Sequence, residues 1–148
     1  MFNTSLAYIV GAAGKMVVTS AITPMVQSTA LLVSSLNTSP VLGITTLHEC
    51  LTEHDVMCTL QMMDATCSVL KSNKEPIRTA TVHIVSCVQQ IHALLTRISD
   101  IAASHAAGYV SRWRQLTLDS EIRQLGSLMG ILRNRFKLMC DIHSVTRS

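Results

Sequence analysis

The segment that decides the fold is residues 77–101, IRTATVHIVSCVQQIHALLTRISDI, in which isoleucine recurs every seven residues at positions 77, 84, 91 and 98. Seven residues are close to two turns of an α-helix, so these isoleucines share one helical face. The other apolar residues that widen this face are Ala80, Cys87, Val88, Leu94, Leu95 and Ile101. A face this broad is typical of a helix in the wall of a bundle and exceeds the seam of a two-stranded coiled coil.

This helix is expected to be long. From Ile77 to about Leu116 the sequence contains no proline, and only Gly108 weakens the helical pattern. About 40 residues at a rise of about 1.5 Å each would make a rod of roughly 60 Å. We therefore predict an elongated molecule.

The last helix along the chain, the third amphipathic helix of the predicted fold, is expected after a break in the apolar pattern near Thr117. The apolar face of this segment steps alternately by four and three residues through Leu118, Ile122, Leu125, Met129, Leu132, Phe136, Met139 and His143. Acidic residues at 119 and 121 and basic residues at 133, 135 and 137 match the helix dipole, which favours a new helix. The pattern leaves open whether the chain turns or only kinks at this point.

Another helix is predicted before residue 71. Ser39 and Pro40 suit a helix start, and Thr46 with Glu49 has the spacing of a capping box, so the helix begins between residues 39 and 46. Its later apolar residues follow the helical period and are Val56, Leu60, Met63, Cys67 and Leu70. The polar run 71–76 ends in a proline that can open the next helix, so the two helices are expected to form an antiparallel hairpin.

Charge divides the chain unevenly. Within residues 1–48 the only charged side chain is Lys15, and the other twenty charged residues lie from Glu49 onward. Residues 1–38 are also rich in small and β-branched residues, and Pro24 is expected to interrupt them. We therefore predict an apolar, low-charge N-terminal arm over 1–38, which packs on the helices or on a neighbour, and a helical bundle domain over 39–148. The predicted fold class is all-α: an elongated helical hairpin or bundle with a third amphipathic helix and this arm.

A membrane anchor is the alternative interpretation of the N-terminal arm, through residues 6–36. The stretch from Leu6 to Thr23 is about long enough to span a bilayer. However, Lys15 lies at its middle, where a charge costs about 2.5 to 3.5 kcal/mol on insertion scales. No basic residue precedes the apolar run, which argues against a secretory signal.

Candidate metal ligands are sparse. The nearest approach to a site is the set His48, Cys50, His54 and Cys58. Zinc takes about four ligands, and a straight helix presents two of them readily, so further ligands would have to come from other helices. Those that the sequence offers are His83, Cys87 and His92. We predict no metal-ligating residue, and the alternative is a helical metal-binding protein or enzyme whose ligands are assembled across helices.

No motif indicates catalysis or a cofactor. Glu49 and Glu53 lie one helical turn apart, but neither begins the Glu-x-x-His motif that a di-metal carboxylate bundle uses. Pairs of Cys and His arise by chance in a helical chain with five Cys and six His. We therefore predict a non-enzymatic protein with no catalytic residue and no cofactor.

Composition bounds the cellular setting and the partners. The five cysteines are neither dense nor spaced as a disulfide framework, so we expect reduced thiols and an intracellular location that is cytosolic, nuclear or virion-associated. The formal net charge is only +3, and Trp113 and Phe136 fall on apolar stripes, which leaves no aromatic side chain among the basic residues for base stacking. Nucleic acid is therefore not expected as a partner.

The third helix carries the candidate partner-binding residues. Gly126 and Gly130 are spaced as small-xxx-small, and a glycine inside a helix costs about 1 kcal/mol relative to alanine, so another helix is expected to dock closely there. That helix would come from a neighbouring subunit or from the alanine-rich stretch 102–107. Arg133 and Arg135 flank the apolar stripe and are candidates for ion pairs at an interface.

The function that the sequence favours is a structural or assembly subunit of a larger protein complex, such as a capsid or a membrane-bound assembly. Apolar residues make up 48% of the chain and charged residues only 14%, and eight methionines are spread over adaptable apolar faces. A surface of this kind is usually covered. Other protein subunits, in a homo- or hetero-oligomer, are therefore the expected partners.

Overall fold

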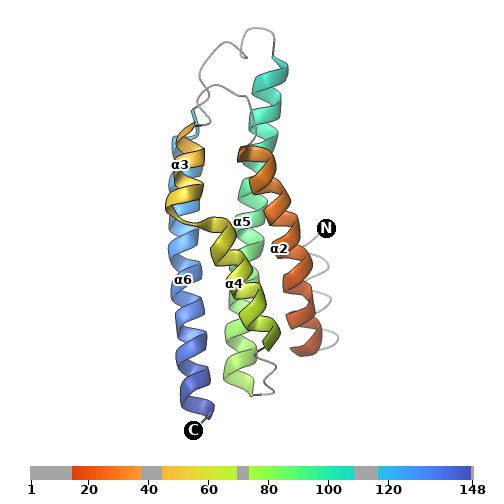
Figure 1. Cartoon of the computed structure of the whole chain (residues 1–148), viewed down its shortest axis with the longest axis vertical. Helices are drawn as coiled ribbons and strands as arrows, with labels where there is room; N and C mark the ends of the chain where they lie inside the picture. The colour runs from red at the N-terminus through yellow and green to blue at the C-terminus, as the bar shows by residue number, and fades with distance from the viewer. Residues whose placement is uncertain (1–14, 38–44, 70–73, 109–116, 148) are drawn as a thin grey trace.

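The computed structural model describes residues 15–37, 45–69, 74–108 and 117–147, and within these ranges every regular element is an α-helix. The elements are α2 (Lys15–Asn37), α3 (Thr45–Glu53), α4 (Val56–Val69), α5 (Glu75–Ala107) and α6 (Asp119–Arg147). α3 and α4 follow each other along one side, so the described helices make four rods that run alternately up and down an elongated bundle (Figure 1). The all-α class is confirmed.

α5 carries the centre of the core. All four isoleucines of its heptad repeat are buried, and Ile84, Ile91 and Ile98 have no exposed surface. α5 packs most extensively on α6 and next on α2, and its apolar residues share one core with those of α4. A helix with neighbours on several sides needs a broad apolar face, which is what the sequence predicts for it.

The upper end of α5 differs from the prediction. The helix ends at Ala107 and not near Leu116, because Gly108 leaves the helical conformation with φ −72° and ψ 131°. The Gly108 N–H still donates to the Ser104 carbonyl at 3.2 Å and so closes the last turn. The 33 residues of α5 span about 50 Å. Residues 109–116 lie outside the described part of the chain.

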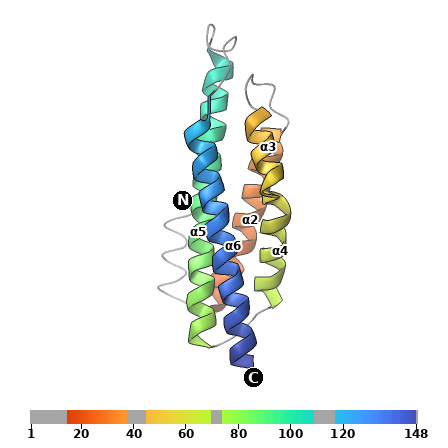
Figure 2. The same cartoon turned by 90° about the vertical axis from the view of Figure 1, so that its left-hand side faces the viewer.

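α6 is the predicted third helix. It runs back along α5 in the opposite direction, so the chain reverses between α5 and α6 and does not merely kink (Figure 2). Buried positions on its predicted stripe are Leu118, Leu125, Met129, Leu132 and Met139, while Ile122 and Phe136 are partly buried against the core.

The predicted helix before residue 71 is present, but it is broken in two. It starts at Thr45, inside the expected interval, whereas Ser39 and Pro40 lie outside the described residues. α3 ends at Glu53, and Asp55 has a φ of 48°, in the left-handed region that Asp tolerates better than most residues. α4 then continues in the same general direction and forms an antiparallel hairpin with α5 (Figure 1).

Part of the predicted N-terminal arm is a helix of the bundle. α2 packs on α5 and α4, and Met25, Val26, Val33 and Leu36 lie in the core. Pro24 does not interrupt this segment, because it lies exposed inside α2 while the next two residues are buried. Residues 1–14 of the arm lie outside the described chain.

Two polar contacts fix the position of α2. The His48 Nε2–H of α3 donates to the Leu36 carbonyl in the last turn of α2 at 2.7 Å. Ser28 Oγ of α2 is hydrogen-bonded to His92 Nε2 of α5 at 3.0 Å.

A search of the described helices for a membrane-spanning segment finds none that combines the necessary length with sufficient apolar character.

Candidate functional site

All four candidate partner-binding residues lie on α6, at one edge of the bundle. α6 packs extensively on α5 and lightly on α3. Figure 2 shows α6 along the front of the molecule, with no described helix over its outer face. This face is the candidate interaction site.

Arg133 ties α6 to the break between α3 and α4. Its guanidinium donates from Nη2 to the backbone carbonyl of His54, and Nη1 lies 3.5 Å from Nδ1 of the same residue. Since arginine only donates hydrogen bonds, Nδ1 of His54 acts as the acceptor and the ring proton is on Nε2. Arg133 therefore has a role inside the fold, and its predicted role in partner binding stays a prediction.

Gly126 lies close to a side chain of the α3–α4 break, and the predicted docking of a second helix on this glycine stays a prediction. A Cβ atom at Gly126 would lie 3.2 Å from Nε2 of His54, which is tighter than an ordinary contact. The side chain packed on this glycine therefore comes from the break between α3 and α4, and not from the alanine-rich stretch of α5. A Cβ atom at Gly130 would meet nothing within 4 Å, so the surface there is open.

Arg135 ties α6 to α5. Its Nη1 donates to the His83 carbonyl at 2.9 Å, and the side chain is only partly exposed. Arg133 thus reaches from α6 to the α3–α4 break, and Arg135 reaches to α5, one on each side of the buried stripe. The sequence predicted that they flank this stripe, but it does not specify the carbonyl groups that they bind.

A second apolar stripe runs along the outer side of α6. Ile131, Leu138 and Val145 are 39%, 57% and 75% exposed. They are spaced by seven residues, so they follow one another along one face of the helix. We call these three residues the outer stripe. The outer stripe was not predicted from the sequence, although the spacing of 131, 138 and 145 was a signal that could have revealed it.

Partly covered apolar residues continue the outer stripe toward α5. Leu128 is 7% exposed and Ile142 is partly exposed. Cys87 of α5 donates its Sγ–H to the Leu128 carbonyl at 3.5 Å, so the inner margin of the stripe lies against α5. The stripe therefore borders the α5–α6 contact and is not an isolated surface feature.

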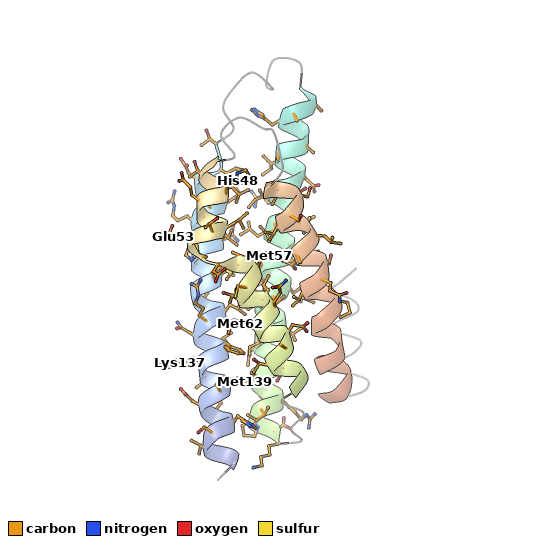
Figure 3. The ribbon with its side chains drawn as sticks, viewed as in Figure 1. His48, Glu53, Met57, Met62, Lys137 and Met139 are labelled. Carbon is orange, nitrogen blue, oxygen red and sulfur yellow. The ribbon has the colours of Figure 1, made fainter. Side chains whose placement is uncertain are left out.

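The candidate metal ligands are dispersed. Cys50 is buried, with its Sγ 3.9 Å from the Ile122 carbonyl, whereas Cys58 is exposed and lies 3.7 Å from Met62 Sδ. Figure 3 shows His48 on the side of α3 toward α2 and Glu53 at its outer edge. In the part of the chain that the structure describes, no three His, Cys, Asp or Glu residues gather into a group that could hold a metal ion.

Burial keeps several thiols protonated near neutral pH. It raises the pKa of the Cys67 thiol to about 11, with smaller contributions from the charges of Asp64 and Cys140. Burial also raises the pKa of Cys50, Cys87 and Cys140. Since the thiolate is the nucleophile and the metal ligand, these side chains are poorly suited to either chemistry.

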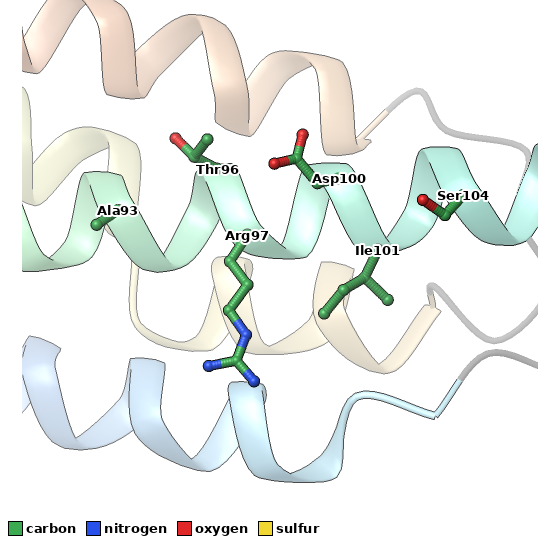
Figure 4. Close-up of a pocket in the computed structure, with 6 residues that line it drawn as sticks. All are labelled: Ala93, Thr96, Arg97, Asp100, Ile101 and Ser104. Atoms are coloured by element: carbon green, nitrogen blue, oxygen red, sulfur yellow. The ribbon is translucent and has the colours of Figure 1, made fainter. Parts of the chain in front are cut away.

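Two surface depressions are lined by residues of a single helix each. One, of about 480 Å³, lies on the upper half of α5 (Figure 4), and it is lined by Ala93, Thr96, Arg97, Asp100, Ile101 and Ser104. The Arg97 side chain extends toward α6, away from Thr96 and Asp100 (Figure 4). The other depression lies on α3, beside His48 and the exposed Glu49 and Glu53. A surface formed by one helix does not enclose a substrate.

No protein-family model, curated protein or solved structure matches this chain. The function is therefore inferred from the geometry of the described residues. Among their features, the outer stripe of α6 is the candidate surface for binding a partner.

Proposed function

We propose that this chain is a non-enzymatic structural or assembly subunit of a larger protein complex. The observation that carries the proposal is the outer stripe, where Ile131, Leu138 and Val145 stay exposed along one face of a helix. Removing apolar surface from water is favourable by about 25 cal/mol per Å². Heptad spacing is the pattern by which one helix packs along another, so the expected partners are protein subunits.

The outer stripe differs from the other exposed apolar side chains. Leu31 on α2 and Met62 on α4 are 73% and 60% exposed, but each is the single exposed large apolar residue among the side chains of its helix that the structure describes. Single exposed apolar residues are normal on a protein surface, whereas an aligned set marks an interaction site. The open surface at Gly130 lies next to Ile131 and gives a neighbour room to approach.

The proposed setting is an intracellular or virion-associated one with reduced cysteines. All five cysteines are free in the structure. Cys67 and Cys87, on α4 and α5, are buried in the core as small apolar side chains, which supports a packing role for them.

The mass of the native particle tests this proposal. The full chain, carrying a small affinity tag, would be isolated without detergent from the cells that produce it, and the particle mass would be compared with the 16.1 kDa of one chain. We expect a mass of at least two subunits. A particle with the mass of a single chain at every concentration measured would overturn the proposal, and so would recovery of the chain only in a lipid fraction that floats on a density gradient.

A further inference from the structure

We infer that the outer stripe binds a second copy of this chain, with α6 packed antiparallel on α6 about a two-fold axis at Leu138. This inference rests on the proposed function and names one partner of the subunit. It concerns Ile131, Leu138 and Val145, which the sequence analysis did not single out.

The first argument is the symmetry of the stripe. Ile131 precedes Leu138 by seven residues, and Val145 follows it by seven. A two-fold axis perpendicular to α6 at Leu138 therefore places Leu138 against Leu138 of the second copy. It also places Ile131 against Val145 of the second copy. An isologous interface requires a self-complementary surface, and this stripe is one.

The second argument is the heptad pattern of apolar residues to which the three exposed residues belong. Leu128, Ile131, Arg135, Leu138, Ile142 and Val145 step alternately by three and four residues, as the a and d positions of a heptad do. Five of these six positions are apolar. The sixth, Arg135, is drawn toward α5 by its hydrogen bond to the His83 carbonyl, so its charged group is directed away from the seam.

The third argument is charge complementarity beside the seam. Lys137 and Asp141 both lie on exposed turns of α6, on the side of the stripe that is farther from α5. Figure 3 shows Lys137 projecting away from the bundle. In an antiparallel pair centred on Leu138, Lys137 of one copy lies about two residues, or roughly 3 Å along the axis, from Asp141 of the second copy. In a parallel pair the equivalent side chains lie on opposite sides of the seam, so Lys137 of one copy would not face Asp141 of the second copy.

The length of the stripe sets the expected strength. From residue 131 to residue 145 the seam is about 21 Å long. A contact of this size belongs to the smaller class of specific interfaces, so the dimer is expected to dissociate on dilution. Experiments on the purified chain therefore need to cover a wide range of concentrations.

Disulfide formation between introduced cysteines tests this geometry. The background carries Cys58→Ser and Cys140→Ser, which remove the exposed and the partly exposed thiol. Leu138→Cys, Ile131→Cys and Val145→Cys would be made one at a time in the full chain. Diamide would be the oxidant, accepting the two electrons and two protons released as two thiols join. Leu31→Cys, on α2, is the matched control because Leu31 is at least as exposed as Leu138, at 73% against 57%, but lies outside the stripe.

We expect Leu138→Cys to form a covalent dimer at least tenfold faster than Leu31→Cys. Ile131→Cys and Val145→Cys should each react slowly alone and rapidly when mixed, because the antiparallel arrangement pairs position 131 with position 145. Rapid reaction of Val145→Cys with itself would indicate a parallel pair and overturn the inference. Equal rates for Leu138→Cys and Leu31→Cys would overturn it too. If the native particle nevertheless contains several subunits, only this inference fails and the proposed function stands.

Discussion

Replacing Ile91 tests the assignment of the core most sharply. Ile91 is the third isoleucine of the heptad repeat and has no exposed surface, so truncation to alanine leaves a cavity between α5 and its neighbours. Changes of this type cost about 2 to 5 kcal/mol, against a total stability of about 5 to 15 kcal/mol for a typical domain. For a chain of this size each kcal/mol lowers Tm by about 2 to 4 °C, so a cost of about 3 kcal/mol predicts a fall of about 6 to 12 °C.

The assay is unfolding of the full chain by heat and by urea, followed by circular dichroism at 222 nm. Gln90→Ala is the control, because Gln90 is the exposed neighbour of Ile91 on the same helix, and its Tm should stay within about 2 °C of the parent. Ile91→Asp should be more damaging than Ile91→Ala, because it also places an unpaired charge in the core. If Ile91→Ala has the same Tm as the parent protein, the heptad isoleucines do not form the buried face and α5 does not pack as described.

Three further predictions address single contacts. Arg133→Met should lower the free energy of unfolding by about 1 kcal/mol, because the His54 carbonyl loses a charge-assisted hydrogen bond at a partly solvated site. Urea titration measures this change in free energy. An unchanged midpoint of unfolding would contradict the role of Arg133 at the α3–α4 break. In the folded protein at pH 8, Cys67 should resist iodoacetamide while the exposed Cys58 reacts, because burial raises the pKa of Cys67 to about 11. Mass spectrometry of peptides measures the alkylation of each cysteine. Faster alkylation of Cys67 than of Cys58 would contradict the burial of Cys67 in the core. Burial lowers the pKa of His92 in the folded state below its ordinary 6.5, so the unfolded chain binds more protons and stability should fall as the pH drops through 6.5. His92→Gln should reduce this dependence, and an equally steep pH dependence in that variant would assign it to another group.

The elements that the sequence predicts well are those whose period repeats several times. The isoleucines of α5 and the stripe of α6 each extend over many turns, so a local irregularity does not obscure the helical face. The ends of the elements are set by single residues and are harder to place. Gly108 ends α5 about eight residues before the expected point, although the sequence analysis noted this glycine as a weak position.

Features that depend on tertiary contacts were not predictable from the sequence. The break between α3 and α4 contains no glycine or proline, and Asp55 takes a positive φ where Arg133, distant in the sequence, binds the neighbouring carbonyl. Pro24 was expected to interrupt the N-terminal segment, yet burial of Met25 and Val26 holds α2 together around it. Deletion of residues 1–38 would therefore remove part of the core.

The sequence placed four candidate partner-binding residues on α6, and their role in binding a partner stays a prediction. Gly126 does lie close to another side chain, that of His54. The sequence could not show that Arg133 and Arg135 bind carbonyl groups of the same chain, because those carbonyls belong to residues 54 and 83. The outer stripe was hidden by a stronger pattern on the same helix, since the buried stripe contains more residues and has a more regular period.

The concentration dependence of the mass of the purified chain tests the central claim most directly, namely that the outer stripe of α6 is an interface between two copies of this chain. Sedimentation equilibrium would compare the parent protein with Leu138→Gln and with the control Leu31→Gln, both of which change exposed residues. We predict that the parent and Leu31→Gln rise from 16.1 kDa toward twice that mass as the concentration increases, while Leu138→Gln stays at the mass of one chain. A parent protein that remains a single chain at every concentration, or a Leu138→Gln variant that associates as well as the parent, would contradict the claim.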